Sequence, residues 1–148
     1  MDKVTMGQTI DEMFSAYSRG DLDGFVAACA DDMHYEDTGG GPPLKGRAAF
    51  REYARGWFDA CSDGVLKPVR KILGADEAAL EMVFTATHDR GELYGVAPTG
   101  KRFELKFAIT LRIANDKVSE LKAWYSPLAP MQAVGLIDAL PTRPAPGH

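Results

Sequence analysis

The stretch that decides the fold class of this chain runs Arg102-Phe103-Glu104-Leu105-Lys106-Phe107-Ala108-Ile109-Thr110-Leu111-Arg112-Ile113. Its large apolar residues alternate without interruption with polar or small ones. A period of two is typical of a β-strand that is buried on one face only. The same alternation occurs over residues 79–88, where one face carries Leu80, Met82, Phe84, Ala86 and His88. The sequence therefore predicts two long, half-buried strands in the second half of the chain.

Helical patterns occupy the first half of the chain. The apolar residues over 10–17 follow the i, i+3, i+4, i+7 spacing of one helix face. We expect Thr5 and Gln8 to form a capping box before this helix and Gly20 to end it. Asp21 is suited to cap a second, short helix. A third helix is predicted where an apolar stripe runs from Phe50 to Phe58.

The remaining segments complete an α+β pattern. A short strand is predicted over 33–37, a Gly/Pro loop over 39–43, a returning strand over 118–126 and a last short helix over 131–136. Helices followed by long antiparallel strands are typical of the α+β class. We expect a cone-shaped, curved antiparallel sheet wrapped around the N-terminal helices, with a pocket at its open end.

Composition bounds the function. The chain has 148 residues, of which 45% are hydrophobic, so we expect a single domain over residues 1–140 and a disordered, Pro-rich tail over 141–148. The net charge of −4 argues against a nucleic-acid partner. No apolar run is long enough to span a membrane, and the first residues do not resemble a signal peptide, so a cytoplasmic location is expected. Cys29 and Cys61 are predicted to be buried thiols.

Four stretches, taken in order, carry a family resemblance. They are Arg19–Asp23, Ala30–Asp37, Gly46–Arg51 and Gly91–Lys101. Together, over residues 8 to 137, they resemble the NTF2-like superfamily and, within it, the SnoaL-like polyketide cyclases and ketosteroid isomerases. The resemblance implies the NTF2-like (cystatin-like) cone, a homodimer formed through the outer sheet face and a small hydrophobic molecule as ligand.

Asp37 and His88 are the candidate catalytic residues. The resemblance places Asp37 where ketosteroid isomerases have their general-base carboxylate. The alternative for Asp37 is a turn residue that bonds the loop backbone. His88 shares the apolar face of its strand, so it is expected to point inward as a proton-transfer partner. The alternative is a core histidine bonded to a backbone carbonyl. No metal-ligand spacing organises the acidic and histidine residues, so neither a metal nor another cofactor is predicted.

Aromatic and apolar residues on the inward faces are predicted to line a pocket for a flat apolar ligand, although most such stripes are plain core. The predicted substrate-binding residues are Met13, Tyr17, Tyr35, Tyr53, Trp57, Phe84, Phe107, Ile109 and Tyr125.

Departures from the family pattern leave the function open. By the resemblance, Met13 and Ile109 stand where ketosteroid isomerases have their oxyanion donors, and Ala123 stands where the cyclases have an acid/base Asp. One hypothesis is an enzyme that performs isomerase- or cyclase-type proton transfer on a small hydrophobic carbonyl compound. The alternatives are a binding module without chemistry and a dimerising interaction domain with Trp124 as its anchor.

Overall fold

The computed structural model of the protein describes residues 1–138. Its elements are α1 (Lys3–Ser18), α2 (Leu22–Ala27), β1 (Cys29–Asp37), β2 (Leu44–Lys45), α3 (Arg47–Ala60), β3 (Val65–Leu73), β4 (Glu77–Thr87), β5 (Arg102–Ala114), β6 (Lys117–Trp124) and α4 (Leu128–Ala133). The predicted α+β class is confirmed. The predicted tail over 141–148, and with it the end of the predicted domain, lies outside the described residues.

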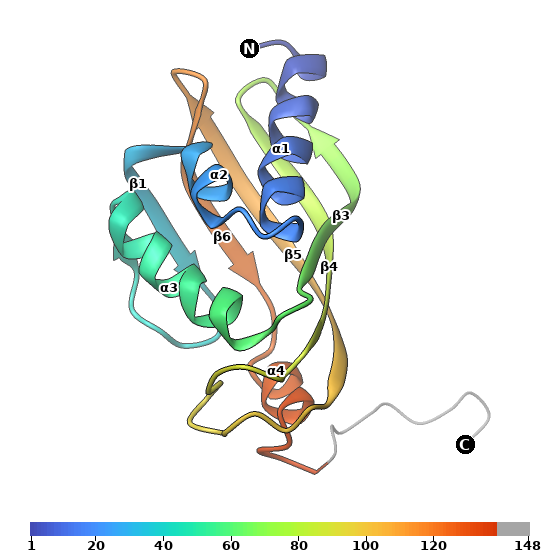
Figure 1. Ribbon diagram of the computed structural model, residues 1–148. Coiled ribbons are helices and arrows are strands. Elements are labelled where there is room, and N and C mark those ends of the chain that lie inside the picture. The colour runs from blue at the N-terminus through green and yellow to red at the C-terminus, as the bar shows by residue number, and fades with distance from the viewer. Residues whose placement is uncertain (139–148) are drawn as a thin grey trace, which may run out of the picture.

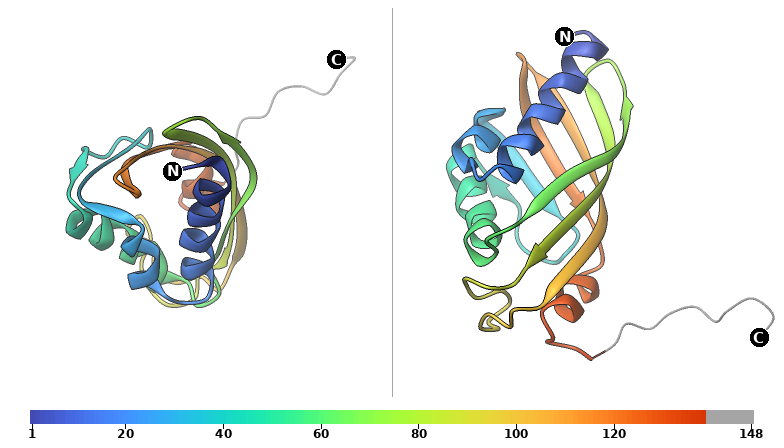
Figure 2. Two further views of the ribbon diagram at one scale, coloured as in Figure 1. Left: turned by 90° about the horizontal axis from the view of Figure 1, so that it is seen from above. Right: turned by 45° about the vertical axis from the view of Figure 1, so that its right-hand side comes forward.

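The strands form one curved sheet that partly encloses the helices. Its strand order is β2-β1-β6-β5-β4-β3. Figure 1 shows α1, α2 and α3 on one side of the sheet, with α4 below its lower end. Seen from above, the sheet bends around α1, while α3 lies beside β1 (Figure 2). The cone-shaped arrangement expected from the sequence is therefore present.

One strand pair departs from the predicted antiparallel sheet. β1 runs parallel to β6, with Asp37 opposite Ala123, whereas the other neighbouring strands are antiparallel. A short hairpin forces antiparallel pairing, but β1 and β6 are joined through α3 and four intervening strands. This long connection lets the chain return in the same direction.

The ends of the first two helices follow local hydrogen bonding. Asp2 caps α1, since its Oδ1 accepts from the backbone N–H of Thr5 at 2.7 Å, so the predicted capping box at Thr5 is wrong. Gly20, with φ 85°, follows the helix as predicted. Asp21 caps α2 as predicted, through the N–H of Gly24 at 2.8 Å.

Two elements near the sheet edges differ from the sequence prediction. No strand was predicted over β3, an edge strand that contains Pro68 and a register shift between Pro68 and Arg70. A bulged, largely exposed edge strand does not show clean alternation. Helix α4 begins at Leu128, three residues before the predicted start at Met131, because Pro127 occupies its N-cap position.

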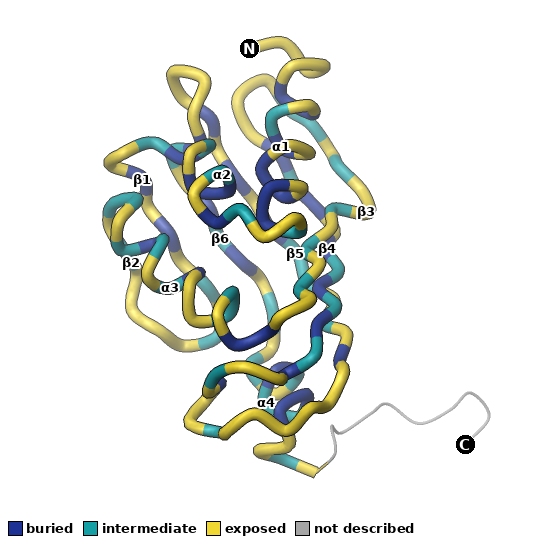
Figure 3. The backbone as a smooth tube through the Cα atoms, in the orientation of Figure 1, coloured by how far each residue is buried: buried dark blue, intermediate teal, exposed yellow. Residues whose placement is uncertain are grey.

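The core lies between the concave face of the sheet and the helices (Figure 3). Along β5, Phe103, Ile109, Leu111 and Ile113 are buried while the intervening polar residues are exposed, as the alternation predicts. Both cysteines are buried free thiols, which agrees with the prediction. Within residues 1–138, no helix combines the length and apolar character needed to cross a membrane.

Candidate ligand cavity and its tyrosine cluster

A cavity opens between the helices and the concave face of the sheet. The centre of a water molecule can reach about 140 Å³ of it. A dry apolar cavity of roughly 150 Å³ is large enough to bind benzene. The lining is almost wholly apolar and comes from α1, α2, β1, α3, the inner sheet face and the start of α4. The space therefore suits one aromatic or alicyclic ring, with any larger ligand extending towards solvent.

Nearly all predicted substrate-binding residues line this cavity. They are Tyr17, Tyr35, Tyr53, Trp57, Phe84, Phe107, Ile109 and Tyr125. The exception is Met13, which is 1% exposed and packs in the core instead. Met13 lies one turn before Tyr17 on α1, and on this helix only Phe14 and Tyr17 reach the cavity. The prediction for Met13 as a ligand contact is therefore corrected to a core position.

Asp37, Ala123 and Ile109 form one row across three neighbouring strands. Ala123 is the partner of Asp37 in the β1–β6 pair and of Ile109 in the β5–β6 pair. Ala123 and Ile109 both line the cavity. The row therefore carries its carboxylate at one end and only apolar side chains beside it.

The Asp37 carboxylate is half-buried and bonded on both oxygens. Oδ1 accepts the backbone N–H of Gly39 at 2.8 Å, and Oδ2 accepts the hydroxyl of Tyr35 at 3.0 Å. The first bond is the turn contact that the alternative interpretation predicts. Because a carboxylate offers about four acceptor positions, these two bonds leave Asp37 able to accept further hydrogen bonds.

Four tyrosines gather around Asp37, namely Tyr35, Tyr53, Tyr94 and Tyr125. Burial is the main cause that raises the pKa of each phenol above its ordinary value, and the nearby charge of Asp37 acts in the same direction. All four hydroxyls are therefore protonated at neutral pH and can donate hydrogen bonds. They supply the polar groups at the edge of an otherwise apolar cavity.

The family model described as SnoaL-like polyketide cyclase matches residues 8–134. The chain belongs to the SnoaL-like family. Similar solved structures include AclR from Streptomyces galilaeus, named as a candidate hydroxylase, with 25% identity and a TM-score of 0.82 over 95% of this chain and 87% of that one. A search of curated proteins returned no match.

Two further structures share the fold at lower identity. A candidate polyketide cyclase from Xanthomonas campestris is 18% identical, with a TM-score of 0.79 over 90% of this chain and 98% of that chain. A protein with a ketosteroid isomerase-like fold from Catenulispora acidiphila is 16% identical, with a TM-score of 0.71 over 90% and 97%. These matches confirm the NTF2-like fold that the resemblance implied.

Tyr94 of this SnoaL-like protein was not predicted as a site residue. It lies in the turn Leu93–Val96, whose two ends exchange backbone hydrogen bonds of 3.1 and 2.8 Å. Both central residues have positive φ, 52° at Tyr94 and 74° at Gly95, as a type I′ turn requires. The ring centres of Tyr94 and Trp57 lie 6.0 Å apart in a T-shaped arrangement. In the sequence, this turn is indicated by a residue followed by glycine, Tyr94-Gly95, between the apolar residues Leu93 and Val96.

His88 takes the place described by its alternative interpretation. It is fully buried, its Nε2 lies 2.6 Å from the carbonyl oxygen of Gly91, and its Nδ1 has no partner among residues 1–138. It does not line the cavity. The ring is buried, as the inward direction predicted, and its bond is to the backbone of Gly91. Among the described residues, the hydrogen bonds of Asp37 go to Gly39 and Tyr35 and that of His88 goes to Gly91, so none of them joins the two predicted catalytic residues.

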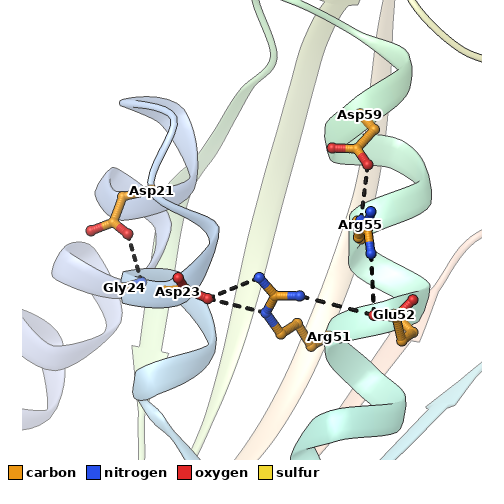
Figure 4. A network of polar contacts seen from close by, with 7 residues as sticks. All are labelled: Asp21, Asp23, Gly24, Arg51, Glu52, Arg55 and Asp59. Atoms are coloured by element: carbon orange, nitrogen blue, oxygen red, sulfur yellow. Dashed lines mark hydrogen bonds and ion pairs between the residues drawn. The ribbon is translucent and has the colours of Figure 1, made fainter.

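A polar groove between α2 and α3 is the other hollow that merits consideration. Arg51 pairs with Asp23 at 3.0 Å, Arg55 pairs with Asp59 at 3.0 Å, and Glu52 lies between the two guanidinium groups (Figure 4). These exposed charges already have partners. Residues 1–138 contain no group of three or more His, Cys, Asp or Glu side chains that could hold a metal ion.

Proposed function

We propose that this SnoaL-like protein binds a small hydrophobic carbonyl compound in the cavity and catalyses proton transfer on it, with Asp37 as the acid/base. One observation carries the proposal. Asp37 does not itself line the almost wholly apolar cavity, but its half-buried carboxylate accepts a hydrogen bond from the protonated phenol of Tyr35 and its strand partner is Ala123, and both of these residues line it. Such a site can both orient a carbonyl group and exchange a proton with the carbon next to it.

In this proposal the carboxylate transfers the proton, and the phenols stabilise the charge that develops on the ligand. Asp37 takes a proton from the carbon next to the carbonyl group, which leaves negative charge on the carbonyl oxygen. Tyr53 and Tyr125, which line the cavity, donate hydrogen bonds to that oxygen. One donor of this kind is typically worth about 10²–10³ in rate. The phenols would thus take the role of the oxyanion donors that Met13 and Ile109 do not supply.

A second candidate function is a binding module without chemistry. The observation that favours it is the apolar pair Ile109 and Ala123, which line the cavity at the positions where the family resemblance implies acidic groups. In that case the phenols fix the orientation of a ligand, and Asp37 serves only to hold the loop through Gly39.

The proposal is tested with 2-tetralone, a two-ring ketone whose C1 protons are activated by both the ring and the carbonyl group. In D₂O, proton NMR follows the replacement of these protons by deuterium. The wild-type protein should accelerate this exchange over buffer, and Asp37→Asn should abolish the acceleration. The matched control is Asp32→Asn, because Asp32 lies on the same strand but is exposed.

Binding is measured separately from turnover. The chain has two tryptophans, so Trp124→Phe leaves Trp57 in the cavity wall as the sole tryptophan reporter. Quenching of Trp57 by 2-tetralone, together with Asp37-dependent exchange, supports the enzyme. Quenching with exchange at the buffer rate supports the binding module. Exchange that survives Asp37→Asn removes Asp37 from the mechanism.

The homodimer implied by the resemblance is proposed through the outer sheet face. Trp124 is 44% exposed there, its indole N–H donates to Thr110 at 2.9 Å, and the Lys122 ammonium lies 4.2 Å from the ring centre. Light scattering should give the mass of two chains for the wild type and of one chain for Trp124→Glu. A wild-type mass of one chain contradicts this proposal.

A further inference from the structure

Tyr125 lies just beyond the last sheet pairing, at the point where the chain leaves the sheet. β6 ends at Trp124, and the pairing of β1 with β6 ends with Asp37 opposite Ala123. Among the described residues, the last backbone hydrogen bond between these two segments runs from the N–H of Thr38 to the carbonyl oxygen of Ala123, at 3.1 Å. The side chain of Tyr125 lines the cavity, so its backbone needs another partner to keep it in place.

The Thr38 hydroxyl supplies that partner. It donates to the carbonyl oxygen of Tyr125 at 2.7 Å and accepts the N–H of the same residue at 2.8 Å. A hydroxyl can do both at once because it has one proton and two lone pairs. In a regular sheet these two backbone groups would bond to the backbone of the neighbouring strand. One side chain therefore extends the connection between the two segments past the end of β1 at Asp37.

Three consecutive residues connect the carboxylate of Asp37 with the phenol of Tyr125. Gly39 donates its N–H to Asp37 Oδ1 at 2.8 Å, and Thr38 holds the Tyr125 backbone. The ring of Tyr125 also packs against Gly39. Thr38 thus holds the backbone of Tyr125 while Gly39 confines its ring, so the position of the phenol depends on the segment that carries Asp37.

We propose that Thr38 is a positioning residue that fixes the Tyr125 phenol relative to the Asp37 carboxylate. This role rests on the proposed function, in which Asp37 takes the proton and Tyr125 donates a hydrogen bond to the carbonyl oxygen. Thr38 is exposed and is not among the residues that line the cavity, so it acts through Tyr125 and not on the ligand. A displacement of about 1 Å at the reacting groups can lower a rate about 10²-fold. Water could replace the hydroxyl as a hydrogen-bond partner, but it would not fix the distance between the two segments.

Thr38→Val removes the hydroxyl and keeps the shape of the side chain. In the 2-tetralone experiment, kcat for deuterium exchange should fall about tenfold or more, because the phenol is no longer held where negative charge develops. KM should stay close to the wild-type value, and so should the quenching of Trp57 measured in the Trp124→Phe background, since the residues of the cavity wall are unchanged. Thr38→Ser keeps the hydroxyl and should restore kcat.

A matched control tests whether the loss of any threonine hydrogen bond has this effect. The hydroxyl of Thr87 donates to Asp63 at 2.8 Å, and neither of these residues lines the cavity. Thr87→Val should therefore leave both kcat and KM unchanged. All variants are compared well below their urea midpoints, so that a loss of folded protein is not mistaken for a loss of kcat.

The position of the phenol is also measured without a ligand. In the wild type, NMR should give nuclear Overhauser effects between the ring protons of Tyr125 and the Cα protons of Gly39, because the two groups are in contact. Thr38→Val should weaken these effects. It should also accelerate hydrogen exchange at the Tyr125 amide by about tenfold or more, because that N–H loses its partner. Thr38→Ser should restore both signals.

The outcomes separate the role of Thr38 from the proposed function. A loss of kcat in Thr38→Val that Thr38→Ser reverses, with KM retained, supports the positioning role. Unchanged kcat in Thr38→Val, unchanged Overhauser effects, or a loss that Thr38→Ser does not reverse would overturn it. A wild-type protein that does not accelerate the exchange of 2-tetralone contradicts the proposed function. In that case the Overhauser effects alone decide whether Thr38 fixes the phenol.

Discussion

Gly39 lies against the phenol of Tyr125. A Cβ atom added to Gly39 would be 2.7 Å from Cζ of that ring, closer than real Cβ contacts come. The same stretch is tied to Tyr125 by Thr38, whose hydroxyl donates to the Tyr125 carbonyl at 2.7 Å and accepts its N–H at 2.8 Å. The absence of a side chain at Gly39 is thus what lets the Tyr125 hydroxyl enter the cluster beside Asp37.

Gly39→Ala is expected to displace the Tyr125 ring. Overpacking of this kind typically costs about 1–3 kcal/mol, and the cavity wall formed by Tyr125 should change with it. We expect weaker quenching of Trp57 by 2-tetralone and a lower denaturant midpoint. Gly41→Ala is the control, because no atom lies within 4 Å of its added Cβ. Equal effects of the two substitutions would contradict the close packing at Gly39.

Ala123→Asp would place a carboxyl group in the cavity wall. Burial there should raise its pKa above the unfolded value of about 3.9. A raised folded-state pKa means that stability is greatest below the unfolded pKa and is lost as pH rises. We therefore expect a larger loss of unfolding free energy at neutral pH than in mild acid, measured by urea titration. Ala108→Asp, on the opposite face of β5, should show little of this pH dependence.

The tyrosine cluster should make the protein sensitive to alkali. Burial raises the pKa of its phenols above the ordinary value of 10.0. Above that pH the unfolded chain ionises its tyrosines while the folded protein keeps them protonated, so stability falls as pH rises. Urea titrations below and above pH 10.0 should show the loss, and Tyr94→Phe should reduce its slope. Tyrosinate absorbance that develops at pH 10.0 in the folded protein would contradict this expectation.

The two thiols should be inert in the native protein. Burial raises the pKa of Cys29 to about 12 and that of Cys61 to about 11. Because the thiolate is the reactive form, a disulfide reagent at mildly alkaline pH should label neither cysteine until the chain unfolds. Labelling in denaturant gives the total of two thiols. Rapid labelling of Cys61 without denaturant would contradict its described burial.

The sequence predicts strands best where burial is one-sided. Along β5 every second residue faces the core, so alternation alone locates the strand. Along β3 the bulge after Pro68 breaks the period, and most of the strand faces solvent. The parallel pairing of β1 with β6 departs from the expected antiparallel sheet, because side-chain alternation reports burial and carries no information on strand direction.

The candidate site was partly predictable from the sequence, because side-chain periodicity identifies the residues that face the core. Helix spacing and strand alternation identify Trp57 and Phe107 as inward-facing, and both line the cavity. Tyr94 depends instead on a left-handed turn, and His88 on which backbone carbonyl its ring meets. Neither contact follows from periodicity. The closeness of Tyr125 to Gly39 depends on two segments that meet only in the folded sheet.

The parallel pairing of β1 with β6 also determines at which stage of chain synthesis the site around Asp37 can form. Thr38 and Tyr125 are 87 positions apart, yet their bonds align the two halves of the cluster. Contacts of such wide sequence separation are slow to form. The ribosome synthesises Asp37 long before Tyr125. The site around Asp37 therefore stays incomplete until β3, β4, β5 and β6 have also been synthesised. The cavity wall that Tyr125 completes is thus among the last parts of the molecule to be assembled, and a ligand would bind only to chains whose synthesis has passed the final strand.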